Sequence, residues 1–289
     1  MLEPILDVLI RAMLRGAQQV LAVRHSGEID ASYKDATELV TVADKRSDAA
    51  IRAVFETELR AIDPTIAFRL EESGATGEQG RHWVGADPLD GTNHFASGGA
   101  SYSVQSHYIV DGLPRIGVVF QPEVYLPLAE TQNCVGRIAY AIHGEGAYCE
   151  RTDFVGGAFV RSEARPLKMR RSPPTRNFVS CVPLSTKMSI EEWDRAKKVL
   201  ESGLVSSTTG VGGAGGNAML ALFGGQHVYA NLGAGEELDL APPQVIAEEA
   251  GMTVWGVDRQ SPLWNVRKQA CVFAPSPEIA ERFLAAAGL

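Results

Sequence analysis

The stretch Asp87-Pro88-Leu89-Asp90-Gly91-Thr92 is the part of this chain that says most about its fold and chemistry. The run before it, Trp83-Val84-Gly85-Ala86, is typical of a short buried strand, so both acids are expected on a turn at the end of that strand. Two carboxylates on one turn can hold a divalent cation or bridge two of them. The Gly-Thr that follows is expected to open a helix whose free N–H groups face an anion. Acidic turns are also common at the solvent surface, so the hexapeptide alone does not decide between a metal site and an ordinary turn.

The composition is that of an ordinary globular protein. The chain has 289 residues, 45% of them hydrophobic, which is enough for one large domain or two closely packed ones. A net charge of -8 argues against nucleic-acid binding, and it would repel a phosphorylated substrate unless metal ions supplied positive charge nearby. The four cysteines form no CxxC pair and are expected to be reduced thiols: Cys134, Cys149, Cys181 and Cys271.

No targeting or membrane segment is expected. Glu3, Asp7 and Arg11 interrupt the apolar residues at the N-terminus, which excludes a signal peptide of the usual kind. No segment is long and apolar enough to span a bilayer. These features favour a cytoplasmic protein that binds a small molecule rather than a membrane.

The hydrophobic pattern predicts an α+β fold with an N-terminal and a C-terminal region. The N-terminal region, residues 1–150, is expected to pack helices over an antiparallel sheet and to hold most of the metal ligands. The C-terminal region, residues 151–289, alternates helix and strand and is expected to supply Asp239 and the substrate-side loops. The two regions are expected to pack tightly, with a division between residues 150 and 177, where Gly-Gly and Pro173-Pro174 interrupt the pattern.

Local signals place the individual elements. Asp111-Gly112 predicts a hairpin turn between strands over 103–110 and 115–120, whereas a polar link is expected around 27–35. The expected helices cover residues 5–17, 44–62, 190–202, 218–223, 240–250 and 277–287. Further strands are expected over residues 66–70, 137–142, 178–182, 227–230, 253–255 and 270–274.

Three more acids lie where a strand or loop meets a helix: Asp44, Glu71 and Asp239. Each has a purely structural explanation. Asp44 fits a capping box with Thr41, Asp239 fits an N-cap, and Glu71 with its neighbour fits a solvated acidic pair. Taken together with the two acids of the hexapeptide, however, they make five carboxylates at element ends. Two or three Mg²⁺ ions need about that many oxygen ligands.

Four blocks in order carry a family resemblance: Leu39-Val40-Thr41-x-x-Asp44, Glu71-Glu72-Ser73, the hexapeptide Asp87 to Thr92, and Asp239-Leu240-Ala241 with Glu249-Ala250-Gly251 downstream. The chain resembles the inositol monophosphatase family over residues 34–251. The resemblance implies a layered αβαβα sandwich of the inositol monophosphatase and fructose-1,6-bisphosphatase type. It also implies a Mg²⁺-dependent phosphomonoesterase that Li⁺ inhibits and that forms a homodimer.

The resemblance implies a role for each acid. Glu71, the Asp87 carboxylate and the Leu89 carbonyl would bind a first Mg²⁺. Asp87 would bridge to a second ion, which Asp90 and Asp239 complete. A third and looser ion would lie near Glu71 and the acid of the first block.

The resemblance also implies the catalytic groups. Thr92, with Glu71 or Asp44, would orient the attacking water and take its proton. The backbone N–H groups of Gly91 and Thr92 would hold phosphate oxygens at a helix N-terminus. Thr92 also fits a plain helix cap, and the two roles are compatible.

The departures from the family fall on the side of the substrate alcohol. Asn93 and His94 follow the hexapeptide in place of the family's usual order; Asn93 is a candidate substrate contact, and His94 is expected to be exposed. The family's Trp-Asp is Leu238-Asp239 here.

Asn231 matches the position of a substrate-binding glutamate, for which Glu236 or Glu237 can substitute. The remaining substrate-side candidates are Gly213 and Ala214, with Asn217 just beyond them.

The substrate is therefore expected to be a small phosphorylated polyol or sugar. Histidinol phosphate, fructose 1,6-bisphosphate and 3′-phosphoadenosine 5′-phosphate, which relatives hydrolyse, are the alternatives. A basic cluster comprises Arg161, Arg165, Lys168, Arg170 and Arg171. It can hold a second phosphate or simply face solvent, and we favour the solvent-facing interpretation. A non-catalytic regulatory protein on the same fold is the competing functional class. The intact set of acids argues against that class. A structural Ca²⁺-binding module is a third class, and the absence of a DxDxDG-type loop argues against it.

Overall fold

The computed structural model describes residues 2–27, 30–33, 39–77, 80–124, 135–169, 178–184, 188–210, 212–264 and 268–289. The predictions for Cys134, Arg170, Arg171 and Pro173-Pro174 lie outside these residues.

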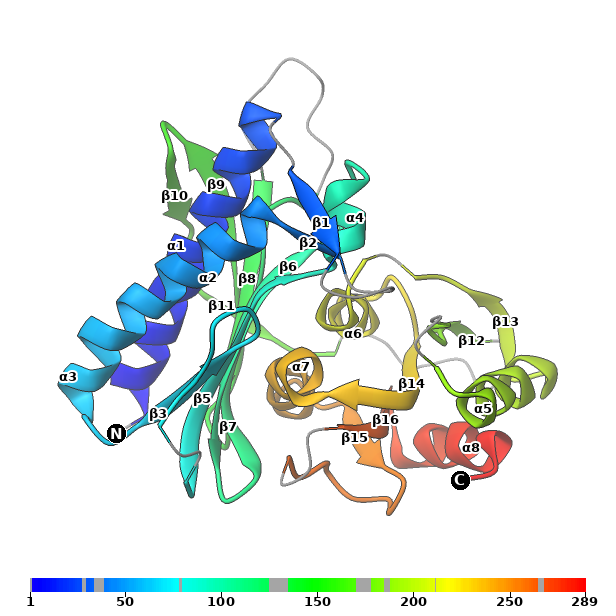
Figure 1. Ribbon diagram of the computed structural model, residues 1–289. Coiled ribbons are helices and arrows are strands. Elements are labelled where there is room, and N and C mark those ends of the chain that lie inside the picture. The colour runs from blue at the N-terminus through cyan, green and yellow to red at the C-terminus, as the bar shows by residue number, and fades with distance from the viewer. Residues whose placement is uncertain are drawn as a thin grey trace.

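Helices and sheets alternate in five layers, which confirms the expected αβαβα fold (Figure 1). The first layer holds α1 (Glu3–Ser26), α2 (Val42–Val54), the π-helix η1 (Phe55–Leu59) and α3 (Arg60–Ile62). The third layer holds α6 (Ala214–Phe223) and α7 (Glu237–Glu249), and the fifth holds α5 (Ile190–Glu201) and α8 (Pro277–Ala287). Among the described residues, none of the helices combines the length and apolarity needed to cross a lipid bilayer.

The second layer is a large sheet in the order β10-β9-β8-β7-β6-β5-β3-β4, with β11 paired to β9. Its pairs are antiparallel except for β3 beside β5. Its strands are β3 (Ala67–Leu70), β4 (Gly74–Thr76), β5 (His82–Asp90), β6 (Ser103–Val110), β7 (Leu113–Gln121), β8 (Val135–Ile142), β9 (Gly146–Val155), β10 (Ala158–Arg161) and β11 (Arg165–Leu167). The predicted hairpin between β6 and β7 is confirmed, because Asp111 and Gly112 both have a positive φ, as a type I′ turn requires.

The fourth layer is a mixed sheet in the order β13-β12-β14-β16-β15. Its strands are β12 (Phe178–Cys181), β13 (Val205–Thr208), β14 (Val228–Glu236), β15 (Thr253–Gly256) and β16 (Lys268–Ala274). The large sheet ends with β11 and this sheet begins with β12, so the change of sheet comes after Leu167. The division of the chain into two regions stays a prediction.

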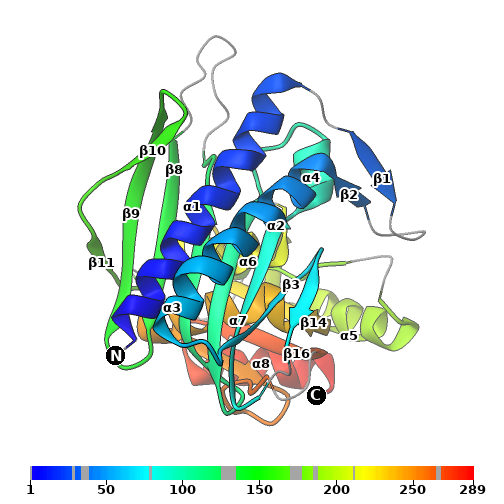
Figure 2. The same cartoon turned by 60° about the vertical axis from the view of Figure 1, so that its left-hand side comes forward.

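Three apolar clusters join the layers. α1 and α2 cover one face of the large sheet (Figure 2). The first cluster lies between these helices and the sheet, and it includes Leu9 and Val84. The second lies between the large sheet and the central helices, where Val119 and Val245 are buried. The third packs the mixed sheet against α5 and α8 around Phe178 and Phe283. The central helices, apolar on two sides, are thus held between two sheets.

The polar link after α1 is more ordered than expected. It contains β1 (Ala31–Tyr33), which pairs with β2 (Leu39–Thr41) in a two-stranded antiparallel sheet. The Val42 N–H also donates to the Asp30 carbonyl, at 3.0 Å. β1 is a strand because β2 supplies its hydrogen-bonding partners. The polar sequence of β1 alone does not indicate a strand. β2 leads directly into α2, so this small sheet lies beside the start of that helix (Figure 2).

Candidate active site

The hexapeptide forms the end of β5 and the turn after it. Two residues of β5 face one of β6 between Asp87 and Asp90, which is a β-bulge that turns both acids inward. Asp87 and Asp90 are buried, at 2% and 6% exposure. The Leu89 N–H donates to the Asp87 carboxylate at 2.8 Å, and the Ser47 hydroxyl of α2 donates to the Pro88 carbonyl at 2.8 Å. A hydrogen bond inside the turn and another from α2 therefore fix its conformation.

Asp87, Asp90 and Asp239 form one carboxylate group. One oxygen of each lies within 4.8 Å of those of the other two. Burial, together with the neighbouring charges of Glu71, Asp90 and Asp239, raises the pKa of Asp87 well above its usual range. Burial and the same kind of repulsion, from Asp90 and Glu71, raise the pKa of Asp239 in the same way. Close, buried carboxylates with only oxygen donors match what a hard divalent cation such as Mg²⁺ requires, so the residues fit the predicted metal.

Asp90 is also tied to the N-terminus of α6. Its carboxylate accepts from the Ala214 and Gly215 N–H groups, at 2.9 and 3.0 Å, and from the Ser103 hydroxyl at 2.9 Å. A Cβ at Gly213 would lie 1.8 Å from Asp90 Oδ1, so only glycine fits there. α6 begins at Ala214, four residues earlier than expected. The glycine-rich segment therefore allows the start of α6 to approach Asp90 closely.

Thr92 and Asp44 form a second polar unit beside the carboxylate group. Thr92 opens α4 (Thr92–Ala96) after Gly91 at φ 95, as expected. The Thr92 hydroxyl lies 2.8 Å from Asp44 Oδ1 and 3.0 Å from the Leu89 carbonyl, and its single proton can be donated to either. Asp44 and Thr41 form the predicted capping box of α2. The cap and the contact with Thr92 therefore coexist in one buried side chain.

Glu71 follows β3, and its side chain is exposed. Its charge raises the pKa values of Asp87 and Asp239, which places it on their side of the turn. It is not a member of the three-carboxylate group, as defined over the residues that the structure describes. Asp48 of α2 accepts from the Glu72 and Ser73 N–H groups, both at 3.2 Å, and so fixes the turn that carries Glu71.

Asp239 lies inside the first turn of α7 and is not the predicted N-cap. The helix begins at Glu237, after Glu236 as N-cap, three residues before the expected start. Pro243 lacks the N–H that would bond the Asp239 carbonyl in a regular helix. The Gln105 side chain of β6 donates to that carbonyl instead, at 3.4 Å. A side chain of the large sheet thus compensates for a proline inside the helix.

A cavity of about 370 Å³ opens beside Asp239. It is lined by Pro183, Met188, Glu192, Ala214, Asn231, Gly233, Gly235, Glu236, Asp239 and Lys268. The structure thus brings three predicted substrate-side residues together: Ala214, Asn231 and Glu236. It does not bring Asn93 or Gly213 into the lining, and Asn217 turns its amide to the Gly213 carbonyl, at 2.9 Å.

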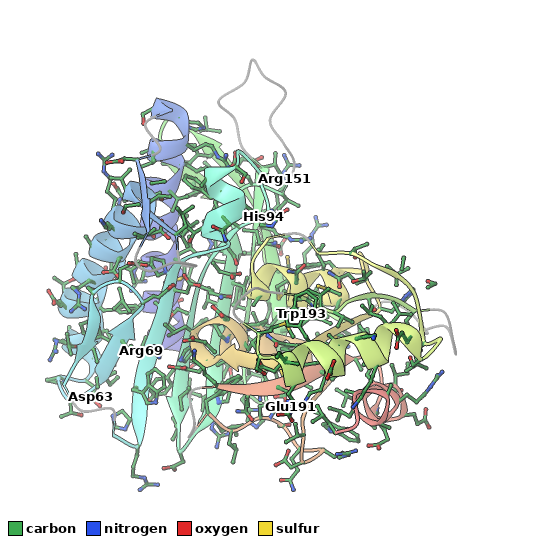
Figure 3. The ribbon with its side chains drawn as sticks, turned by 45° about the vertical axis from the view of Figure 1, so that its right-hand side comes forward. Asp63, Arg69, His94, Arg151, Glu191 and Trp193 are labelled. Atoms are coloured by element: carbon green, nitrogen blue, oxygen red, sulfur yellow. The ribbon has the colours of Figure 1, made fainter. Side chains whose placement is uncertain are left out.

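Glu236 and Glu237 differ in where they point. Glu236 faces the cavity and pairs with Lys268 at 2.7 Å. Glu237 is fully buried and pairs with Arg69, so it cannot contact a substrate in the cavity. His94 is exposed, as expected, and Figure 3 shows it on α4, at the end of the large sheet.

The basic cluster splits in the structure. Arg161 is bound to the buried Glu150 carboxylate by two hydrogen bonds, at 2.6 and 2.7 Å, so it is not simply a solvated side chain. Arg165 and Lys168 are exposed. Three cysteines in the described part of the chain are free: Cys149, Cys181 and Cys271.

Sequence reasoning missed the side chains that hold the acids in place: Ser47, Asp48, Ser103 and Gln105. A signal existed for the first two. Ser47 and Asp48 follow Asp44 at helical spacing, on the face that continues into the core at Ile51. Polar residues at core-facing positions need partners, and the partners here are the turns that carry the candidate ligands.

Comparison with known proteins gives one consistent family. The model of the inositol monophosphatase family matches residues 1–288. The Nus factor SuhB of Pasteurella multocida is 34% identical over 125 residues, which are 42% of this chain and 45% of that protein. The first curated relatives are thus matched over less than half of their own length.

Solved structures share the fold along the whole chain. The extragenic suppressor protein SuhB of Bartonella henselae has a TM-score of 0.74 at 20% identity, covering 98% of both chains. An IMPase/NADP phosphatase complexed with Mg²⁺ and phosphate has a TM-score of 0.69 at 19% identity, covering 97% of this chain and 94% of that one.

Proposed function

Because this chain belongs to the inositol monophosphatase family, we propose that it is a Mg²⁺-dependent phosphomonoesterase that hydrolyses a small phosphorylated polyol or sugar. The observation that carries the proposal is the buried group of Asp87, Asp90 and Asp239 beside the Thr92–Asp44 contact. A metal-binding group next to a hydroxyl–carboxylate pair is the arrangement that metal-assisted hydrolysis of a phosphate ester needs.

The acids would hold Mg²⁺ in two main positions. Asp87, Asp90 and Asp239 would hold one ion, and Glu71, Asp87 and the Leu89 carbonyl the other. A third ion would bind more loosely, near Glu71 and Asp44. Bound Mg²⁺ supplies Lewis acidity, because it neutralises phosphate charge and lowers the pKa of a bound water.

Thr92 and Asp44 would act on the attacking water. The Thr92 hydroxyl can donate to Asp44 and accept from a water at the same time. Burial raises the pKa of Asp44, despite the hydrogen bonds from Thr41 and Thr92, and this makes its carboxylate a better proton acceptor. Glu71 is the alternative acceptor. The N–H groups of Gly91 and Thr92, with Asn93 nearby, would bind phosphate oxygens.

The charges of the cavity favour a monophosphate. Apart from Asp239, whose charge bound Mg²⁺ would neutralise, Glu192 and Glu236 line it against one cation, Lys268, which already pairs with Glu236. A second phosphate on the substrate would meet this excess of negative charge. The cavity therefore favours a neutral polyol or sugar, or a cationic alcohol such as histidinol, over a bisphosphate. Asn231 and Glu236 would contact its hydroxyl groups.

The resemblance also supports inhibition by Li⁺, a homodimeric state and a cytoplasmic location as elements of the proposal. The Pasteurella multocida relative is named a Nus factor, so a regulatory binding protein on the same fold is the second candidate.

Phosphate release from a panel of esters tests the proposal. The panel should contain inositol 1-phosphate, other sugar and polyol monophosphates, histidinol phosphate, fructose 1,6-bisphosphate and 3′-phosphoadenosine 5′-phosphate, each with Mg²⁺ and with EDTA. Mg²⁺-dependent release from a monophosphate is expected. No release from any ester would favour the regulatory candidate.

A further inference from the structure

A buried ion pair joins the strand that leads to Glu71 with the helix that carries Asp239. Arg69 lies on β3 and Glu237 opens α7, 168 residues further along the chain. Arg69 Nη1 contacts Glu237 Oε1 directly. The Glu237 side chain is 0% exposed and the Arg69 side chain 16%. Figure 3 labels Arg69 next to the central helices, on β3, which lies between β5 and the edge strand β4 of the large sheet.

Each partner stands two residues before a candidate metal ligand. Arg69 precedes Glu71, and Glu237 precedes Asp239 within one helical turn. The pair therefore joins two elements that would bring oxygens to neighbouring ions, which Asp87 would share. We propose that Arg69 and Glu237 are positioning residues that set the separation of Glu71 and Asp239, and thereby the affinity for Mg²⁺. This inference rests on the proposed function.

Stability alone does not account for this pair. Burying two charges carries a large desolvation cost, and well-packed apolar side chains are often at least as stable in their place. An ion pair is directional, however, and fixes the distance between two backbones more closely than apolar contact does. Metal ligands must be placed within about 0.5 Å of their working positions, so this added definition has a use here.

Among the residues that the structure describes, Arg69 is the charged partner of Glu237. Burial lowers the pKa of the neighbouring His107 to about 3, so its ring is uncharged at neutral pH and offers Glu237 no second cation. In the described part of the chain, Glu237 Oε2 accepts no hydrogen bond. The orientation of the Glu237 carboxylate therefore depends on Arg69.

The test is the binding of Mg²⁺ alone, measured by calorimetry on the full chain. The double variant Arg69→Met/Glu237→Leu keeps the net charge and the packing volume but removes the directional contact. We expect its melting temperature to stay near that of the wild type and its Kd for Mg²⁺ to rise about tenfold or more, as for other residues that orient ligands. Glu237→Asp keeps both charges and withdraws the carboxylate by about 1.5 Å, one carbon–carbon bond. It should fold, and it should raise the Kd by about threefold or more, a smaller effect than the tenfold or more expected when such a residue is removed altogether.

The matched control is Arg161→Met/Glu150→Leu. It removes an ion pair whose carboxylate, on Glu150, is also buried, at 4% exposure. Glu150 lies on β9, and three strands separate β9 from β5, which carries the candidate ligands. Its Mg²⁺ affinity should equal that of the wild type. Wild-type affinity for Mg²⁺ in both Arg69→Met/Glu237→Leu and Glu237→Asp would overturn this inference and leave the proposed function standing. If the double variant does not fold, wild-type affinity in Glu237→Asp is enough to overturn the inference. Absence of Mg²⁺ binding to the wild-type protein would overturn the proposed function, and this inference with it.

Discussion

The Thr92 hydroxyl lies 2.8 Å from the Asp44 carboxylate, to which it can donate a hydrogen bond. The same carboxylate caps α2 by accepting from the Thr41 N–H and hydroxyl, at 2.7 and 2.6 Å. One buried acid thus links the start of α2 to the start of α4. Its position is fixed by the fold before any substrate binds, as a group that orients a water must be.

Thr92→Val should remove catalysis and leave metal binding intact. Valine has nearly the volume of threonine but cannot orient a water or pass its proton to Asp44. We expect kcat to fall by about 10²- to 10⁴-fold, the usual contribution of a general acid or base. Steady-state kinetics and Mg²⁺ calorimetry on the same sample provide the check, with the exposed Thr57→Val as control. A normal kcat in Thr92→Val would contradict the assignment.

Gly213→Ala should displace Asp90, because the added Cβ would lie 1.8 Å from the carboxylate oxygen. Activity should become undetectable, and Mg²⁺ should bind more weakly. Gly210→Ala is the matched control in the same glycine-rich segment, since its Cβ would meet nothing closer than Cys181 Sγ at 3.7 Å. Equal activity in the two variants would show that the approach of α6 to Asp90 does not matter.

Asp239→Asn should stabilise the metal-free protein. The pKa of Asp239 is raised by burial and by repulsion from Asp90 and Glu71, and a neutral amide removes that cost. In EDTA the melting temperature should rise, by roughly 2–4 °C for each kcal/mol of repulsion relieved. Mg²⁺ should stabilise the variant less than the wild type, because Asp239→Asn removes a ligand of one ion and leaves the ligands Glu71, Asp87 and the Leu89 carbonyl of the other. A lower melting temperature for the variant in EDTA would contradict the proposed repulsion.

Glu248 predicts a dependence of stability on pH that is independent of the metal site. Burial raises its pKa to about 7 from 4.5, so the folded state favours the protonated form. The stability that this proton provides is complete below pH 4.5 and is lost as the pH rises through 7; a shift of that size corresponds to about 3 kcal/mol. Glu248→Gln should therefore stabilise the protein at pH 8 more than at pH 5. Denaturant unfolding at both values measures this, and an equal effect at both would refute it.

The sequence predicted those elements that local rules determine. The capping box of Thr41 and Asp44 and the hairpin turn at Asp111 depend only on neighbouring residues. The five-layer order was predicted from the family resemblance alone. The structure confirms that order, and it brings Asp87, Asp90 and Asp239 together as the resemblance implied.

What the sequence did not predict depends on distant partners. α6 starts early because Asp90, more than 100 residues before it, accepts from its first N–H groups. α7 continues through Pro243 because Gln105 compensates for the missing donor. The Arg69–Glu237 pair spans 168 residues. Each of these features needs a partner that only the folded chain brings near, and no local pattern identifies it.

We propose that the buried carboxylates Asp87, Asp90 and Asp239 hold Mg²⁺ for the hydrolysis of a phosphate monoester. The most direct measurement is phosphate release from the ester panel by the wild type and by Asp90→Asn, in Mg²⁺ and in EDTA. We expect the wild type to release phosphate from at least one monophosphate in Mg²⁺ only, and a folded Asp90→Asn protein to have a kcat lower by orders of magnitude. Near-normal turnover by the folded variant, or turnover by the wild type in EDTA, would contradict it.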